Sequence, residues 1–267
     1  KRVGAGSAPT AGVRPVDCRA MATSRARLGA TVALSAALVV ACGPPAERAT
    51  PADGEASAGA PIAGRWRAVL LSPGGELPFG LEVTSTPDGL AAAMVNGEER
   101  APFSAVSVDD RRVVFETEWY ASRITAELDP EGDSMRGSWE RTSAGGSVSR
   151  LPFTASRDRQ ERFLPLSEVG LEPAGTTPVS ADGDRPGDWI DGTWAVEFTD
   201  EDGTEPARGE FHEQDGRVRG TFLTPTGDYR YLEGSVERGV LRLSTFDGAH
   251  AFLFQAKLRE DGSLAGD

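Results

Sequence analysis

The sequence has few of the residues that most often carry catalysis or bind metals. It contains two cysteines and two histidines in 267 residues. Cys18 and Cys42 are too far apart for a Cys-x-x-Cys pair, and the histidines form no metal-spaced cluster. The sequence also lacks a Gly-rich phosphate loop and a recognisable Ser-His-Asp set. These absences predict no catalytic residue, no bound metal and no cofactor within this chain.

Positive charge is also scarce. The formal net charge is −13 and the isoelectric point is near 4.7. A protein with this negative charge repels the phosphates of nucleic acid. We therefore expect no nucleic-acid partner.

Long apolar runs are absent except for one near the N-terminus. A short basic stretch with Arg25 and Arg27 precedes apolar and small residues from Leu28 to Ala41. A run of this length is too short for a stable anchor across a bilayer, and its basic start is typical of a signal peptide. We predict a signal peptide over residues 21–41.

The end of this run carries a motif, Val39-Val40-Ala41-Cys42. It resembles the lipobox of bacterial lipoproteins. The resemblance implies that Cys42 receives lipid, becomes the mature N-terminus and holds the protein on a membrane through its acyl chains. It also implies a place in the cell envelope, facing the periplasm or the exterior. The alternative is a secreted protein whose signal peptide ends at an incidental cysteine.

The segments on either side of the signal peptide differ from it. Residues 1–20 begin with Lys and have no hydrophobic pattern, so we predict that they are untranslated or misassigned sequence. Residues 42–61 are rich in Pro, Ala, Gly and Glu and contain no aromatic residue. Such a segment cannot bury enough apolar surface to offset the entropy of ordering, and we expect a flexible, disordered tether.

The rest of the sequence reads as two copies of one unit. Each copy opens with Gly-x-Trp, at Gly64 and at Gly192. Three further matches follow in the same order, at offsets of about 127 to 130 residues: Pro87-Asp88-Gly89 with Gln214-Asp215-Gly216, Val113–Phe115 with Val240–Arg242, and Leu128–Gly132 with Leu258–Gly262. Four matches in one order predict a tandem duplication.

Both copies have the residue pattern of antiparallel β-structure. Apolar Ile124, Ala126 and Leu128 alternate with polar residues, which places one face of a strand on a core and the other in water. By the same pattern, Arg242 lies between two leucines and is expected to face water. Asp-Gly and Asn-Gly pairs separate the runs, as turns do.

The predicted fold class is therefore all-β. We expect two tandem antiparallel β-meander units, each a small barrel or sandwich. The first unit spans residues 62–156 and the second residues 189–267. A Pro/Gly/Asp-rich connector, residues 157–188, joins them.

The two copies differ at their ends. In the first copy, Gly137-Ser138-Trp139 precedes a further strand at 147–154, whereas the equivalent stretch of the second copy is Leu264–Asp267. We expect the second unit to be truncated and the chain to be a fragment of a longer protein. The alternative is a second unit with a shorter edge.

Two groups of residues are candidates for ligand contacts. His212 and His250 fall on predicted strands and could bind a metal together with Glu210 or Asp247, but scattered histidines are more often ordinary strand residues. Five tryptophans could line a ligand cavity, although β-cores commonly use tryptophan as packing. For a ligand cavity, we expect the lining residues Trp119, Phe222 and Phe252.

One segment of the second copy suggests a family. Leu243–Phe254 resembles a stretch upstream of the thioredoxin-like domain in bacterial thiol-disulfide oxidoreductases of the TlpA/redoxin type. The resemblance covers Gly192–Asp267, and Gly64–Arg157 only through the duplication. It implies a non-catalytic, β-rich accessory or spacer region. Because this sequence has no Cys-x-x-Cys, no catalytic residue is carried over, and the redox domain would lie beyond Asp267.

The sequence thus favours a membrane-anchored extracytoplasmic lipoprotein that serves a thioredoxin-like enzyme as an accessory region. Its expected partners are the membrane and either a C-terminal redox domain or another protein. The alternative function is a stand-alone lipoprotein that binds a small apolar ligand inside a β-barrel.

Overall fold

The structure is a computed structural model that describes residues 10–15 (backbone only), 62–157, 159, 161–175, 188–200, 203–229 and 231–267. All of these residues belong to one body, which contains both of the β units described below. The predicted lipidation residue Cys42, the lipobox residues Val39, Val40 and Ala41, and the tether lie outside the described residues. Within the described part, no helix has the length and apolarity needed to cross a membrane.

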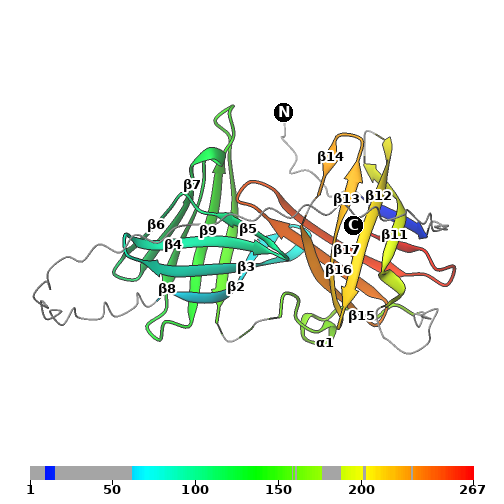
Figure 1. Ribbon diagram of the computed structural model, residues 1–267, viewed down its shortest axis with the longest axis horizontal. Helices are drawn as coiled ribbons and strands as arrows, with labels where there is room; N and C mark the ends of the chain where they lie inside the picture. Colours follow the sequence, from blue (N-terminus) through cyan, green and yellow to red (C-terminus); the bar gives the residue numbers. More distant parts are fainter. Residues whose placement is uncertain are drawn as a thin grey trace, which may run out of the picture. The chain divides into compact units, whose positions relative to one another are not determined.

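The first β unit is an antiparallel sheet of nine strands, drawn in cyan and green in Figure 1. Its strand order is β5-β4-β3-β2-β10-β9-β8-β7-β6. The elements are β2 (Gly64–Ser72), β3 (Gly75–Thr86), β4 (Gly89–Asn96), β5 (Glu99–Pro102), β6 (Ala105–Asp109), β7 (Arg112–Thr117), the 3-10 helix η1 (Glu118–Tyr120), β8 (Ser122–Leu128), β9 (Ser134–Thr142) and β10 (Val148–Ser156).

The second β unit is also antiparallel, with the order β12-β11-β1-β18-β17-β16-β15-β13-β14. Because β12 also pairs with β13, eight of these strands form a closed ring. The elements are β1 (Thr10–Pro15), β11 (Gly192–Asp200), β12 (Gly203–Gln214), β13 (Arg217–Thr224), β14 (Gly227–Asp228), β15 (Leu232–Glu237), β16 (Val240–Phe246), β17 (Ala251–Leu258) and β18 (Leu264–Gly266). The predicted all-β class is confirmed.

The two sheets match strand by strand. The run β4-β3-β2-β10-β9-β8-β7-β6 of the first unit corresponds to β13-β12-β11-β1-β18-β17-β16-β15 of the second. In this correspondence β1 occupies the position of β10. Its pairings with β11 and β18 join Val13 to Val196 on one side and to Leu264 on the other.

Repeated hydrogen bonds also support the similarity of the two units. Trp66 Nε1 donates to the Ile62 carbonyl at 2.9 Å, and Trp194 Nε1 donates to the Ile190 carbonyl at 2.8 Å. Each bond ties a buried tryptophan to the residue four positions before it, just ahead of β2 in the first unit and of β11 in the second. The described residues therefore form two similar β units, as the repeat predicts.

Each unit has its own aromatic core. Trp66, Phe79, Phe115 and Phe153 belong to the core of the first unit, which also takes in Phe246 from the second. The second core contains Phe198, Phe211, Phe222 and Phe254, whose rings contact one another. Burial of side chains of this size contributes about 1.5–3 kcal/mol each, so these two cores supply most of the stabilisation.

The prediction that Arg242 faces water is wrong. Its side chain is 3% exposed, and its guanidinium lies 5.0 Å from the ring of Phe163. The same face of β16 carries Ser244, whose hydroxyl donates to the Pro78 carbonyl at 2.6 Å. Strand β16 is buried along its whole length because β3, β4 and the connector cover the face that alternation assigns to solvent.

The connector does more than link the units. Its described part contains α1 (Leu166–Val169) and η2 (Asp188–Ile190). Ahead of α1, Arg162 inserts between the two sheets and donates to the Val95 carbonyl, Asn96 Oδ1 and the Ser244 carbonyl at 2.9–3.1 Å. The Pro/Gly/Asp-rich composition predicts only a linker here, and nothing in the local sequence indicates this contact.

Candidate functional site

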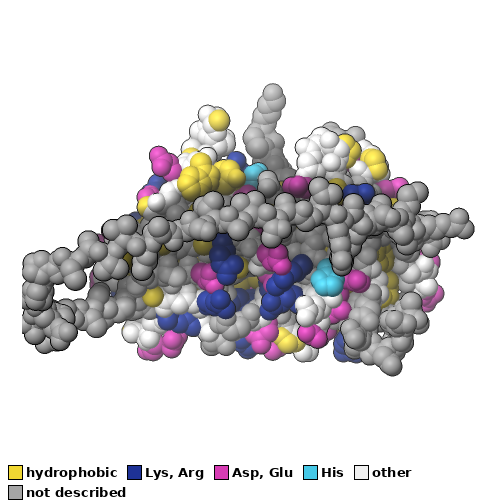
Figure 2. Space-filling view, viewed as in Figure 1, with side chains coloured by type: hydrophobic (Ala, Val, Ile, Leu, Met, Phe, Trp, Pro, Cys, Tyr) yellow, Lys and Arg dark blue, Asp and Glu magenta, His cyan; other side chains and the backbone are white. Residues whose placement is uncertain are grey.

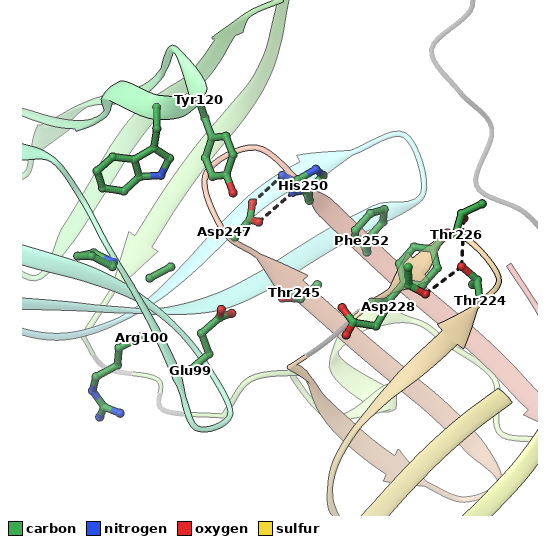
Figure 3. Close-up of a pocket in the computed structure, with 15 residues that line it drawn as sticks. Glu99, Arg100, Tyr120, Thr224, Thr226, Asp228, Thr245, Asp247, His250 and Phe252 are labelled. Atoms are coloured by element: carbon green, nitrogen blue, oxygen red, sulfur yellow. Dashed lines mark hydrogen bonds and ion pairs between the residues drawn. The ribbon is translucent and has the colours of Figure 1, made fainter. Parts of the chain in front are cut away.

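An open cleft of about 690 Å³ lies at the contact between the units (Figure 3). The first unit contributes residues from β5 and η1, and the second contributes β14, the turn before it, and the ends of β16 and β17. The lining residues are Glu99, Arg100, Ala101, Pro102, Trp119, Tyr120, Thr224, Thr226, Gly227, Asp228, Tyr229, Thr245, Asp247, His250 and Phe252.

A row of aromatic rings runs along this cleft. Tyr120 meets His250 edge to face at a centroid distance of 5.9 Å. His250 stacks on Phe252 at 6.0 Å, and Phe252 contacts Tyr229 at 4.6 Å. The row therefore begins on η1 and ends beside β14, so that both units contribute to one aromatic surface (Figure 3).

Trp119 adds a fifth ring, and its exposure is unusual. It is 59% exposed, whereas Trp66, Trp139 and Trp194 are all buried. It lies in η1, which ends at Ala121 with a left-handed backbone (φ 47°). This short helical turn breaks the alternation of β7 and β8, and so no core face is available to Trp119 at this position.

The polar side of the cleft contains an Asp-His pair. His250 Nδ1 lies 2.9 Å from Asp247 Oδ2, and the other carboxylate oxygen accepts from the amides of Ala249 and His250. Burial raises the pKa of the Asp247 carboxyl, but the hydrogen bonds from His250 and Ala249 outweigh burial and keep this pKa below its usual value. Asp247 is therefore a fixed negative charge.

The three predicted ligand-lining residues do not share one enclosed interior. Trp119 and Phe252 line the open cleft. Phe222 is 3% exposed in the core of the second unit, where its ring contacts Phe198, Phe211 and Phe254.

Tyr120 and Tyr229 are not among the candidates that the sequence predicts, and His250 is predicted only as a possible metal ligand. The two-residue spacing of His250 and Phe252 signals that they share a face of β17, but nothing local indicates that Tyr229 joins them.

The described residues contain no group of three or more His, Cys, Asp or Glu that could hold a metal ion. His212 lies 3.0 Å from Asp191, and both side chains are exposed. His250 pairs with Asp247, within the turn between β16 and β17, and not with His212. In the described part of the chain, His250 has no hydrogen bond to a Ser, Thr or Cys side chain that could act as a nucleophile.

Comparisons with known proteins give no further guide to the site. No protein-family model, no curated protein and no solved structure matches this chain.

Proposed function

We propose that the chain is a membrane-anchored extracytoplasmic lipoprotein, and that its β units form the accessory and spacer region of a thioredoxin-like thiol-disulfide oxidoreductase. Cys42 would carry the lipid, and the catalytic domain would follow Asp267. In this proposal the described residues perform no catalysis. Together with the tether they keep the attached enzyme near the membrane and so raise its effective concentration near its targets.

The contact through Arg162 is the observation that carries the spacer role. A spacer must keep its units in a fixed arrangement, and Arg162 bridges the sheets through five hydrogen bonds, to Val95, Asn96, Glu233 and twice to Ser244. Buried hydrogen bonds of this kind are costly to break. Two β units coupled in this way keep a fixed placement relative to each other, whereas two units on a free linker do not.

The anchor is tested by labelling. The wild-type chain and a Cys42→Ser variant are expressed in a bacterium supplied with an alkyne fatty acid, and the cells are fractionated. We expect the label and membrane sedimentation in the wild type, and neither in the variant. Equal labelling of both proteins, or none in either, would rule out Cys42 as the lipid site.

The link to a redox enzyme is tested by the source DNA. Reading several hundred bases beyond the codon for Asp267 should reveal an open frame that encodes a thioredoxin-like domain with Cys-x-x-Cys. A stop codon directly after Asp267 would refute the redox-domain part of the proposal and would not affect the proposed lipid anchor at Cys42.

The exposure of Trp119 favours a second function, the binding of a ligand in the cleft. Five rings lie beside the carboxylates of Asp228 and Asp247 and the hydroxyls of Thr224 and Thr226. Aromatic faces pack against the C–H faces of sugar rings, and carboxylates accept hydrogen bonds from sugar hydroxyls. A short oligosaccharide fits this mixed surface better than the wholly apolar ligand expected from sequence.

Calorimetric titration with chitotetraose tests this function. The wild type should bind, and Trp119→Ala should lose about tenfold or more in affinity, since one aromatic contact in a binding site is worth about 1–2 kcal/mol. Tyr231→Ala is the matched control, because Tyr231 is exposed and lies outside the cleft lining. No heat of binding in the wild type, or equal losses in both variants, would count against the cleft.

A further inference from the structure

A second groove crosses the contact between the units, and its lining is rich in arginine. It measures about 450 Å³ and is lined by β2, β3, β4 and β5 of the first unit and by β13 and β15 of the second, with a residue of the connector. Its charged lining residues are Arg65, Arg67, Arg100, Arg162, Arg217, Arg219, Glu82 and Glu233. In Figure 2, dark blue side chains gather near the middle of the view, with magenta side chains beside them.

The lining of the groove carries a net positive charge, although the protein as a whole is negative. Six arginines and two glutamates line it, whereas the whole chain carries −13. Two further carboxylates, Glu76 and Glu98, pair with lining arginines from outside the groove and still leave more guanidiniums than carboxylates. This excess of guanidiniums in a concave site favours anions there.

The ion pairs within the groove are shared. Glu82 lies 2.9 Å from Arg65 and 3.0 Å from Arg100, so that one carboxylate serves two guanidiniums. Glu233 likewise lies 3.2 Å from Arg162 and 3.5 Å from Arg217. Each guanidinium has five N–H donors, so one shared carboxylate leaves donors of Arg65, Arg100 and Arg217 to water or to another acceptor.

Arg219 leaves a donor unused. Its Nη1 lies 3.4 Å from Glu98 Oε1, a long contact to a side chain that is 82% exposed. Its Nε is buried and has no hydrogen-bond partner among the described residues. A buried donor without a partner costs free energy, and the Arg219 side chain is 42% exposed, so it can turn to donate to an anion in the groove.

We propose that this groove binds a phosphate group. Phosphate presents several acceptor oxygens on one compact anion, and arginine pairs bind it through paired N–H donors. The outer guanidiniums of Arg65, Arg100, Arg217 and Arg219 come from both units and are exposed enough to turn toward a ligand. The phosphate could belong to a soluble compound or to a lipid headgroup. The site does not depend on the spacer role or on the sugar cleft.

The test uses the full chain with Cys42→Ser as background, so that no lipid anchor holds the protein on vesicles. One variant adds Arg217→Gln with Arg219→Gln, and a second adds Arg65→Gln with Arg100→Gln. The control adds Arg150→Gln with Arg208→Gln, which removes the same charge from exposed arginines outside the groove lining. Thermal unfolding confirms that each protein is folded.

Titration with inorganic pyrophosphate at low ionic strength gives the main readout. We expect one binding site in the parent and the control, and about a tenfold or larger loss in both groove variants, because hydrogen bonds to charged groups are lost. Co-sedimentation with phosphatidylglycerol vesicles, against phosphatidylcholine vesicles, identifies the source of the phosphate. Groove-dependent binding to phosphatidylglycerol indicates a lipid headgroup, and binding to pyrophosphate alone indicates a soluble ligand. Binding to neither probe, or equal losses in the control, overturns the proposal.

Discussion

Arg162 of the connector and Glu233 on β15 of the second unit form an ion pair, with Arg162 Nη1 3.2 Å from Glu233 Oε2. Both side chains are nearly buried, at 9% and 12% exposure. Burial lowers the pKa of Arg162 to about 10, although the charge of Glu233 opposes this shift. The pKa still leaves the guanidinium charged at neutral pH, so an uncompensated charge would remain if either partner were removed.

We predict that Arg162→Met destabilises the protein by about 3–5 kcal/mol, because it removes five hydrogen bonds and, among the described residues, leaves the nearly buried Glu233 with only the Gly97 amide and a 3.5 Å contact to Arg217. Urea unfolding measures the loss. Arg150→Met is the control, because Arg150 pairs with Glu140 on the surface and should cost under about 1 kcal/mol. Similar losses in the two variants would contradict a bridging role for Arg162.

Asp247 predicts a pH dependence. Its folded-state pKa is lowered, so its contribution to stability is present above the unfolded value, near 3.8, and is lost as the pH falls through the lower folded value. Asp247→Asn should cost about 1–2 kcal/mol at pH 7, since a charged acceptor is replaced by a neutral one. Urea midpoints should differ at neutral pH and converge as the pH falls below 3.8. A constant difference across this range would refute the assignment.

Two equivalent glycines should tolerate no side chain. A Cβ at Gly137 would lie 1.9 Å from the Thr125 carbonyl oxygen, and a Cβ at Gly266 would lie 1.7 Å from that of Gln255. We expect Gly137→Ala and Gly266→Ala each to destabilise their unit by about 3 kcal/mol, because backbone must move. Gly145→Ala should change the unfolding midpoint little, since its nearest neighbour is 3.9 Å away.

Trp119 should account for most of the tryptophan fluorescence that acrylamide quenches. It is the most exposed of the described tryptophans, and Trp66, Trp139 and Trp194 are shielded in the cores. Trp119→Phe should therefore remove most of the accessible emission without changing the unfolding midpoint. Trp189→Phe serves as the control and should remove a smaller share. Unchanged quenching in Trp119→Phe would mean that η1 holds this ring in a buried position.

The sequence was sufficient for the fold class and the repeat. Alternation in β8 buries Ile124, Ala126 and Leu128, as expected, and the turns that match between the copies join equivalent strands. Such features depend on local periodicity and turn chemistry, which single segments encode.

The candidate sites were less accessible from sequence. Arg242 breaks the alternation rule because another unit covers its face, and that contact joins residues far apart in the chain. The aromatic row and the arginine groove also combine residues from both units. Each residue has an ordinary local pattern, and only the packing of the two sheets brings them together.

Strand β1 affects the order in which the chain can complete its sheets. The first unit has every strand once residue 156 has been synthesised, because β10 follows β9 through a local hairpin. The second unit pairs residues 11–13 with residues 264–266, so its ring cannot close until translation has passed that point. If residues 1–20 are untranslated, or if cleavage before Cys42 removes them, β11 and β18 lose the strand that lies between them and the ring is open.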